Sequence, residues 1–600
     1  MEKNTIWAIV LSALVLVVFM FIQMVYFPEQ VMTPTAVENP NQVVSTTEVQ
    51  LEDTSATLSA TENTSSNEIS VENDETLSEE TYVITTEKVR VTFTNRGGDI
   101  ISYELLDHKD GENYVQMADN ITSSNRAFSI AFGSASNGII NDIFNVKQID
   151  DKTIGFYKKF LITNDDGTTN SFVLAKQYTF KDDDYIFRMD VSIDGDENMK
   201  ELVFGNTAYT IRTSPQIGPQ YNLKNDRYEY RSFMSFDGNK KKKVTLAGGQ
   251  SKVYDKEFSW TGVAGKYFEI LGIPLDRSSM HDVLYSCAME SDENSNAQIM
   301  ITRDAITERD VKDTYYFYVG PKTEKNLKIY NTSDDNAWKL SGLKLNESIE
   351  SAGILSWLES FLKWCMEILY KIIPNWGVSI IILTILIKIL LFPLTKKSSL
   401  SSLQMQEVQP RMQEIQLKYK DQPEKMNMEL SKLYKETGYN PLSGCLPLLI
   451  QFPIIIAMYN LFNNYFEFRG AMFIPGWIPD LSSGDSIYTL NFRLPFGLGN
   501  HIRLLPIIYL FSQLVFGKVT PTANAGGNGM QMKLFQYGMP IFFFFIFYNA
   551  PSGLLIYWTI SNMLQLVQQI FLNRVVKAKR EEMERNKANE KKVFVPRKKK

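Results

Sequence analysis

Long apolar runs separated by short polar stretches dominate the second half of the chain. Five of these runs are candidate membrane spans: residues 376–394, 442–466, 502–519, 535–549 and 552–572. Residues 6–27 form a sixth candidate of about 22 uncharged residues, which can cross a hydrocarbon core of about 30 Å. This run is longer than the apolar part of a typical signal peptide, and no small-residue cleavage site follows it directly. We therefore expect residues 1–28 to be an uncleaved anchor.

The first half shows a different pattern, in which β-branched and polar residues alternate over short stretches. One begins at residue 81, "TYVITTEKVRVTFTNRGGDIISYELL", and turns at Gly97–Gly98. Similar stretches recur as "SFVLAKQYTF", "YIFRMDVSI" and "TYYFYVG". Alternation with period two is typical of half-buried strands, so residues 81–350 are predicted to form a large antiparallel β-sandwich.

Two segments flank this predicted sandwich. Residues 29–80 are rich in Ser, Thr, Glu and Asn, which predicts a disordered tether. Residues 351–373 carry charges at i,i+4 spacing, and four charges are expensive at the centre of a bilayer. We therefore favour an amphipathic helix in the outer interface over a seventh span. Its apolar positions recur at helical spacing: Ile354, Leu358, Phe361, Cys365 and Ile368.

Residues 396–440 form a charged segment that also has helical periodicity. One apolar face is Val408, Met412, Ile415 and Tyr419, and Met426, Leu430 and Leu433 repeat the spacing after a break at Asp421-Gln422-Pro423. The pattern predicts an antiparallel helical hairpin that stops near Gly438. It is either a structural loop with solvated faces or a docking or gating element over the membrane helices.

Charge is distributed unevenly, and this sets the predicted orientation. The net charge of −6 over 600 residues averages an acidic first half and a second half with basic loops. Residues 396–440 carry eight basic residues, and the tail of residues 575–600 ends in "RKKK". Basic loops stay in the cytoplasm. Both termini are therefore predicted to be cytoplasmic, and residues 28–350 to lie outside.

Several chemistries find little support. Cys287, Cys365 and Cys445 lack metal-ligand spacing, and the three histidines are far apart in sequence. The glycine-rich "TANAGGNGM" (residues 522–530) follows no predicted strand, as a phosphate cradle would require. We expect no metal, cofactor, nucleotide or catalytic residue. A membrane-anchored envelope enzyme is the alternative, and the sandwich is better interpreted as a scaffold that contacts carbohydrate or protein.

Lys388 interrupts the apolar run "TILIKILLFPLT". At 1.5 Å per residue it lies roughly 9–10 Å from the cytoplasmic edge of its span. It either snorkels along its own stem or faces a watery cavity, as intramembrane charges usually do. Thr384 and Thr395 share its helical face. Polar residues also occur in other spans, where interhelical hydrogen bonding is the alternative explanation: Gln451, Tyr557, Ser561, Gln565 and Gln568.

A cationic pocket open to the cytoplasm would attract an acidic, hydrophilic tail into the inner leaflet, because desolvation strengthens the attraction. Apolar helix surface beside it would guide the hydrophobic segment into lipid, and burial of that segment requires no nucleotide. This predicted slide consists of Ile455, Met458, Phe462 and Phe543. A transporter or channel is the main alternative, but it predicts intramembrane acids or internal repeats that we do not find.

Three segments closely resemble the YidC/Oxa/Alb insertase family: "NWGVSIIILTILIKILLFPLTKK", "YNPLSGCLPLLIQFPIIIAMYNLF" and "PSGLLIYWTISNMLQLVQQ". "TNRGGDI" and "YVGPK" are similar to that family's periplasmic domain. The resemblance implies the six-span form of double-membraned bacteria, in the inner membrane. It implies an α-helical polytopic protein, with an anchor, a periplasmic β-super-sandwich and a five-helix insertase core at residues 374–574.

The resemblance also implies partners and site residues. Clients would be nascent membrane proteins, inserted alone or with the Sec translocon, and the basic tail would contact the ribosome or, alternatively, lipid headgroups. The family's groove cation is usually arginine, and Lys388 occupies the matching position, which keeps the charge but loses the bidentate fork. Gln451 matches a groove amide and Trp558 an aromatic near the groove. The predicted groove is thus Lys388, Thr384, Gln451, Trp558, Ser561 and Gln565.

Overall fold

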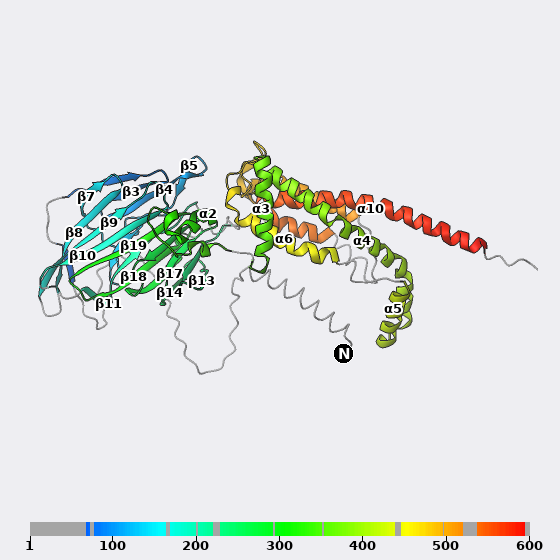
Figure 1. Cartoon of the computed structure of the whole chain (residues 1–600), viewed down its shortest axis with the longest axis horizontal. Coiled ribbons are helices and arrows are strands. Elements are labelled where there is room, and N and C mark those ends of the chain that lie inside the picture. Colours follow the sequence, from blue (N-terminus) through cyan, green and yellow to red (C-terminus); the bar gives the residue numbers. More distant parts are fainter. Residues whose placement is uncertain are drawn as a thin grey trace, which may run out of the picture. The chain divides into compact units, whose positions relative to one another are not determined.

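The chain consists of a β-rich part followed by a helical part (Figure 1). The computed structural model describes residues 68–71, 77–163, 168–197, 199, 202–219, 229–291, 294–350, 353–437, 446–495, 497–519 and 537–593. The predicted anchor, most of the predicted tether and the end of the basic tail lie outside the described residues.

Antiparallel strands form a large sandwich, in which buried residues alternate with more exposed ones along some strands and other strands are buried along their whole length. In spatial order the ten-stranded sheet contains β1 (Glu68–Val71), β8 (Thr153–Thr163), β9 (Thr169–Thr179), β10 (Ile186–Gly195), β19 (Asp310–Pro321), β16 (Phe268–Pro274), β15 (Trp260–Ala264), β12 (Ser232–Phe236) and β13 (Lys241–Val244), with β7 (Asn145–Asp150) also on β8. The five-stranded sheet is β14 (Ser251–Tyr254), β17 (Met280–Ser286), β18 (Gln298–Ile306), β11 (Leu202–Arg212) and β6 (Ser129–Phe132). The four-stranded sheet is β2 (Thr81–Thr85), β3 (Val89–Thr94), β4 (Asp99–Asp110) and β5 (Asn113–Gln116).

One hydrophobic core joins these sheets. The rings of Phe93 on β3 and Tyr178 on β9 lie 5.0 Å apart, so the four-stranded sheet packs on the ten-stranded one. The hydroxyls of Tyr209 on β11 and Tyr315 on β19 lie 2.9 Å apart and join the five-stranded sheet to it. The predicted sandwich is therefore confirmed.

The predicted tether is wrong at one point. Residues 68–71 form β1, which pairs antiparallel with β8 at the edge of the ten-stranded sheet. The local sequence "EISV" alternates polar and β-branched residues, as an edge strand requires. The prediction of a tether rested on the average composition of residues 29–80, which does not reveal a strand of four residues.

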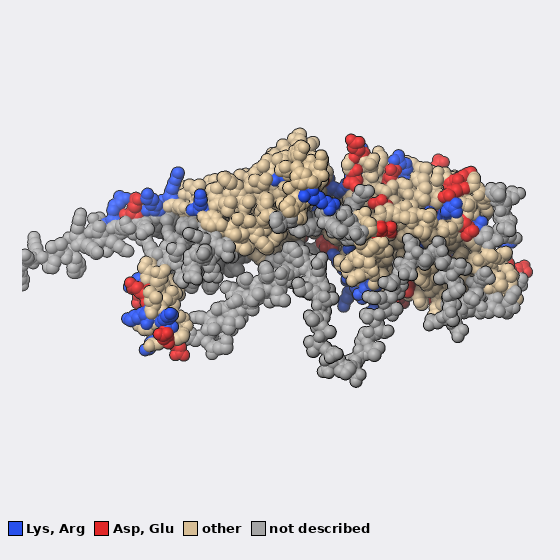
Figure 2. All heavy atoms as spheres, turned by 180° about the vertical axis from the view of Figure 1, so that it is seen from behind, with Lys and Arg blue, Asp and Glu red and all other residues tan. Residues whose placement is uncertain are grey.

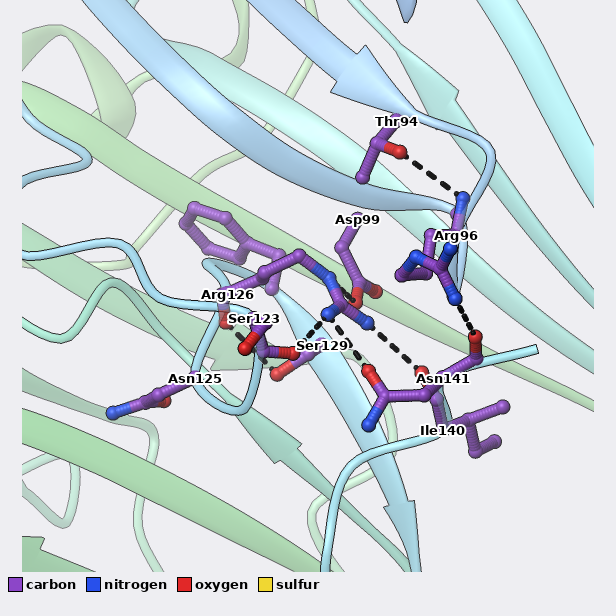
Figure 3. Close-up of polar contacts among 12 residues, drawn as sticks. Thr94, Arg96, Asp99, Ser123, Asn125, Arg126, Ser129, Ile140 and Asn141 are labelled. Atoms are coloured by element: carbon purple, nitrogen blue, oxygen red, sulfur yellow. Dashed lines mark hydrogen bonds and ion pairs between the residues drawn. The ribbon is translucent and has the colours of Figure 1, made fainter. Parts of the chain in front are cut away.

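A buried ionic cluster fastens the turn at Gly97–Gly98 to the sandwich. Asp99 accepts hydrogen bonds from Lys176 and from Arg126 Nε, the latter at 2.9 Å, and all three side chains are buried. Lys176 Nζ also donates to the carbonyl of Gly97. Figure 3 shows the Arg126 guanidinium directed at Asp99 and at the 140–141 segment. Each charge is thus paired, as burial demands.

After β19 the chain passes through short helical turns into α3 (Ser356–Ile372). These are α2 (Glu324–Lys328), η1 (Ile329–Asn331), η2 (Ser333–Asp335), η3 (Leu345–Ser348) and η4 (Gly353–Leu355). The predicted helix is confirmed, but its predicted apolar face is divided. Leu358 and Cys365 of the predicted face pack against the helical core beside Leu362 and Met366, whereas Phe361 and Ile368 are exposed. A second apolar stripe is exposed: Trp357, Phe361, Trp364, Ile368 and Ile372. The placement of α3 in the membrane interface stays a prediction.

The helical part contains each apolar run predicted in the second half. Its elements are α4 (Trp376–Lys418), α5 (Pro423–Thr437), α6 (Leu446–Asn464), η6 (Phe466–Phe468), β20 (Tyr488–Leu494), β21 (Gly499–Ile502), α7 (Leu505–Val519), α9 (Met539–Phe547) and α10 (Ser552–Val593). Among the described residues, the stretch Trp376–Lys397 is the one helix long and apolar enough to cross a membrane by length and composition, and Leu505–Val519 is a shorter apolar helix.

Two predicted boundaries do not exist. The first span and the first arm of the cytoplasmic hairpin form one helix, α4, which continues through Pro393 and Pro410. The last span likewise continues as α10 into the predicted tail as far as Val593. The hairpin itself is present, because α5 begins at Pro423 and buries Leu433, while Val408 of α4 is also buried.

The surface of the helical part matches a membrane location. Figure 2 shows a broad band with few Lys, Arg, Asp or Glu, whereas charges gather on α5 and on the C-terminal part of α10. Large apolar side chains are exposed on the helices that contribute to this part, among them Leu386, Leu390, Phe511, Phe542 and Phe571. Such a contiguous apolar surface is costly in water.

Candidate functional site

Three helices meet around a small cavity. Thr384 and Lys388 come from α4, Gln451 from α6, and Tyr557 and Ser561 from α10. The apolar part of the wall consists of Ile387, Leu391 and Ile454. Tyr557 and Ser561 are four residues apart, so they share one face of α10, as do Thr384 and Lys388 on α4. Four of the six predicted groove residues therefore line one space.

Lys388 points into the helix bundle. Its exposed fraction is 9%, whereas the next two residues, Ile389 and Leu390, are 63% and 78% exposed. Its Nζ donates a hydrogen bond of 3.4 Å to Oε1 of Gln565 on α10. Snorkelling would instead extend the side chain along the lipid-facing surface. The geometry thus favours the cavity over the snorkelling alternative.

A second amide of α10 strengthens this contact. Gln568 Nε2 donates to the backbone carbonyl of Lys388 at 3.4 Å. Gln565 and Gln568 therefore both form interhelical hydrogen bonds, which was the alternative explanation for polar residues in these spans. Gln565 both forms an interhelical hydrogen bond and belongs to the groove, because its partner Lys388 is the cation that faces the cavity.

The hydroxyls of Thr384 and Thr395 donate hydrogen bonds to backbone carbonyls of their own helix, α4. Thr384 Oγ1 donates to the carbonyl of Ile380 at 2.7 Å, and Thr395 Oγ1 donates to that of Leu391 at 3.0 Å. A hydroxyl that has given its proton to its own helix keeps its acceptor lone pairs. Of these two, Thr384 lines the cavity, where it can accept a hydrogen bond from water or a ligand.

The electrostatics of the cavity are simple. Lys388 is the one charged side chain among the residues that line it in the described part of the chain. The space open to the centre of a water molecule is about 10 Å³, close to the least that holds one water. A single cation in a space enclosed by protein attracts an anion more strongly than it would in bulk water.

Trp558 lies elsewhere in the bundle. Its ring centre is 4.5 Å from that of Phe547 and 6.1 Å from that of Tyr509, so it packs toward α9 and α7. Because successive helical residues are rotated by about 100°, Trp558 cannot share the face of Tyr557. It is not among the residues that line the cavity.

The predicted slide residues have divided positions. Met458 and Phe462 are fully buried in the helical core, where Phe462 contacts the ring of Tyr557. They present no surface to a passing segment in this structure. Ile455 and Phe543 are half-buried. Exposed apolar side chains also occur on α9 at three positions outside the predicted slide residues, namely Ile541, Phe542 and Phe545.

One buried polar pair was also missed. Asn562 Nδ2 donates to Oγ of Ser512 at 2.7 Å and joins α10 to α7. Asn562 follows Ser561 directly and so faces away from the cavity; helical spacing would have separated it from the groove stripe. Among the described residues, no group of three or more His, Cys, Asp or Glu side chains is placed to hold a metal ion.

Comparisons with known proteins cover nearly the whole chain. Residues 81–365 match the family described as "YidC periplasmic domain", and residues 368–580 match "60Kd inner membrane protein". The chain is 46% identical over 587 residues to "Membrane protein insertase YidC" of Treponema denticola, covering 96% of this chain and 100% of that protein. The corresponding protein of Treponema pallidum is 41% identical over 617 residues, covering 96% and 99%. A solved structure, "Active YidC insertase crystal structure with the first transmembrane domain resolved", is 20% identical and covers 82% of this chain and 92% of that one, with a TM-score of 0.33.

Proposed function

The chain belongs to the YidC family of membrane protein insertases, and on this premise we propose that the cavity at Lys388 receives the hydrophilic tail of a nascent membrane protein. It is an inner-membrane protein with a periplasmic domain, and its family carries out no bond-making chemistry. Its substrates are nascent membrane proteins.

The observation that carries the proposal is one inward-facing cation held between two helices. Lys388 is 9% exposed and contacts Gln565, a neutral partner that, among the described residues, leaves its positive charge uncompensated. A carboxylate on an entering tail would supply the missing counter-charge. The tail would then cross only part of the bilayer before its hydrophobic segment enters lipid.

Release of the hydrophobic segment requires apolar surface near the cavity. Ile454 lines the cavity, and Ile455 is the next residue along α6. Transfer of an apolar segment of about 20 residues into lipid is strongly favourable at about 25 cal/mol per Å² of apolar surface removed from water. We assign the driving force to this transfer, without a nucleotide.

The partners beyond the client are also part of the proposal. α10 runs without a break from Gln565 to Val593 and becomes rich in Lys and Arg after Arg574. Such a helix suits contact with an anionic partner, which we take to be the ribosome, with anionic lipid headgroups as the alternative. The Sec translocon would act beside the chain for larger clients.

Reconstitution in liposomes tests the function directly. We expect a small single-span protein with an acidic outward tail to insert into vesicles that contain the purified chain, in the absence of any nucleotide. Protection of the tail from external protease measures insertion. Flux of small solutes without insertion would favour a transporter and contradict the proposal.

A further inference from the structure

A two-stranded hairpin in the loop between α6 and α7 carries two exposed aromatic side chains. It consists of β20 (Tyr488–Leu494) and β21 (Gly499–Ile502). Tyr488 and Thr489 pair in register with Ile502 and His501, so their side chains lie on opposite faces, and the register then shifts between Thr489 and Leu494. Tyr488 and Phe492 are 63% and 62% exposed.

The base of the hairpin is fastened to the first turn of α7. The carboxylate of Asp485, three residues before β20, accepts hydrogen bonds from the backbone amides of Leu504 and Leu505 at 2.7 and 3.0 Å. Ile487 N donates to the carbonyl of Ile502 at 3.0 Å, so the two strands leave this point together. The hairpin therefore starts at the end of an apolar helix.

The turn of the hairpin is fastened to a second helix end. Asn549, in the connection between α9 and α10, donates from Nδ2 to the carbonyl of Gly497 at 3.0 Å. Its neighbour Tyr548 donates to the carbonyl of His501 at 3.0 Å. The hairpin therefore lies across the ends of α7, α9 and α10 instead of projecting away from them.

These helix ends are on the periplasmic side. The periplasmic domain precedes α4, so α4 begins outside and runs inward, and α6 returns the chain to the outside before the hairpin. A hairpin held flat at this level lies at the depth of the lipid headgroups. Water is available there for the free edges of a two-stranded sheet, whereas the hydrocarbon core offers none.

We propose that the exposed aromatic side chains of this hairpin, Tyr488 and Phe492, rest in the outer-leaflet interface as a lipid-contacting anchor. Tyrosine is favoured at this depth, where its apolar ring and its polar hydroxyl both find suitable surroundings, and the ring of Phe492 adds apolar area. Thr489, on the face opposite Tyr488, looks toward water. The anchor fixes the outer ends of α7, α9 and α10 relative to the bilayer surface.

Site-directed spin labelling tests the proposal on the full chain in phosphatidylethanolamine–phosphatidylglycerol vesicles. Cys287, Cys365 and Cys445 are first replaced by serine, and retained insertion activity verifies this background. Labels are then placed by Phe492→Cys and, at the adjacent polar position, by Asn491→Cys. Collision rates with oxygen, which concentrates in lipid, and with a water-soluble nickel chelate report the surroundings of each label.

We expect the label at 492 to collide preferentially with oxygen and the label at 491 with nickel, so that the oxygen-to-nickel ratio differs several-fold. Tyr488→Cys and Thr489→Cys form a second matched pair and should reproduce the difference. Equal nickel collision rates at 491 and 492 would place both positions in water and overturn the proposal. Protection of the 492 label from both reagents would show a protein contact instead and would overturn it as well.

Discussion

The ammonium nitrogen of Lys388 lies 3.4 Å from Oε1 of Gln565 and thereby links the charge of α4 to α10. The amide orients the ammonium group and leaves its charge in place, unlike a carboxylate at the same position. Gln568 adds a bond to the backbone of Lys388 itself. The position of the charge relative to the groove wall therefore depends on both helices.

Removal of the charge should impair one class of client selectively. We expect Lys388→Ala to lower the insertion rate of a substrate with an acidic outward tail about tenfold, because a hydrogen bond to a charged group is worth about 1.5–3 kcal/mol. Lys388→Arg should retain insertion, since it keeps the charge. The measurement is protease protection over time in proteoliposomes, with a neutral-tailed substrate as the control. Equal rates for the alanine variant with both substrates would remove the electrostatic role.

Substitution of Gln565 should discriminate between charge and packing. Gln565→Glu places a carboxylate beside Lys388, so the pair becomes neutral and insertion of acidic-tailed clients should fall as in Lys388→Ala. Gln565→Leu preserves the charge and similar volume, and should have a much smaller effect. Insertion assays on both variants, with folding verified by thermal unfolding, make this comparison. The reverse ranking would mean that Gln565 acts only in helix packing.

The buried ionic cluster should contribute strongly to the stability of the periplasmic domain. Asp99→Asn leaves the buried cations Lys176 and Arg126 without their counter-charge, which should lower the free energy of unfolding by about 3–5 kcal/mol. Asp107→Asn is the matched control, because its pair with Lys88 at 2.8 Å is exposed and is worth about 1 kcal/mol or less. Denaturant unfolding followed by the β-sheet signal measures both. Equal losses would contradict the assignment.

Glu269 should make the stability of this domain depend on pH. Its side chain is fully buried, Oε1 accepts a hydrogen bond from Ser348 at 2.8 Å, and burial raises the pKa of the carboxyl from 4.5 to about 7. A carboxyl with a raised pKa in the folded state carries no penalty below pH 4.5, a growing one between pH 4.5 and 7, and the full penalty of about 3 kcal/mol above. Glu269→Gln should therefore match the natural protein near pH 4.5 and exceed its stability at pH 8. Parallel stability–pH curves for the two proteins would refute the assignment.

Periodicity in the sequence predicted most of the architecture, because both the sandwich and the helices depend on which face is apolar. The strands of residues 81–350 and the hairpin break before Pro423 follow directly from such patterns. The ends of the helices were harder to predict from the sequence. Nothing local ends a helix between Leu394 and Lys396, since prolines within a long helix can be accommodated, and α4 continues through Pro393.

Part of the groove could be predicted from the sequence, because helical periodicity also shows which polar residues share a face. Lys388, Thr384 and Ser561 were predictable from a charge and polar positions that share helical faces. The rotation of a helix about its axis is set by tertiary packing, and a resemblance does not supply it. Met458 and Phe462 are apolar enough for a lipid-facing slide, yet the bundle buries both. The ring contact of Trp558 with Phe547 depends on α9 in the same way.

The continuity of α4 has a mechanical consequence. A helix of 43 residues is a rod of about 65 Å, with Lys388 in one half and the arm that packs against α5 in the other. Between them lie Pro393, which removes one backbone hydrogen bond, and a short stretch without any loop. Unless the helix bends at Pro393, a change in the tilt of the cytoplasmic arm therefore also moves the ammonium group. A partner that binds the cytoplasmic arm can thus change the position of the charge inside the membrane.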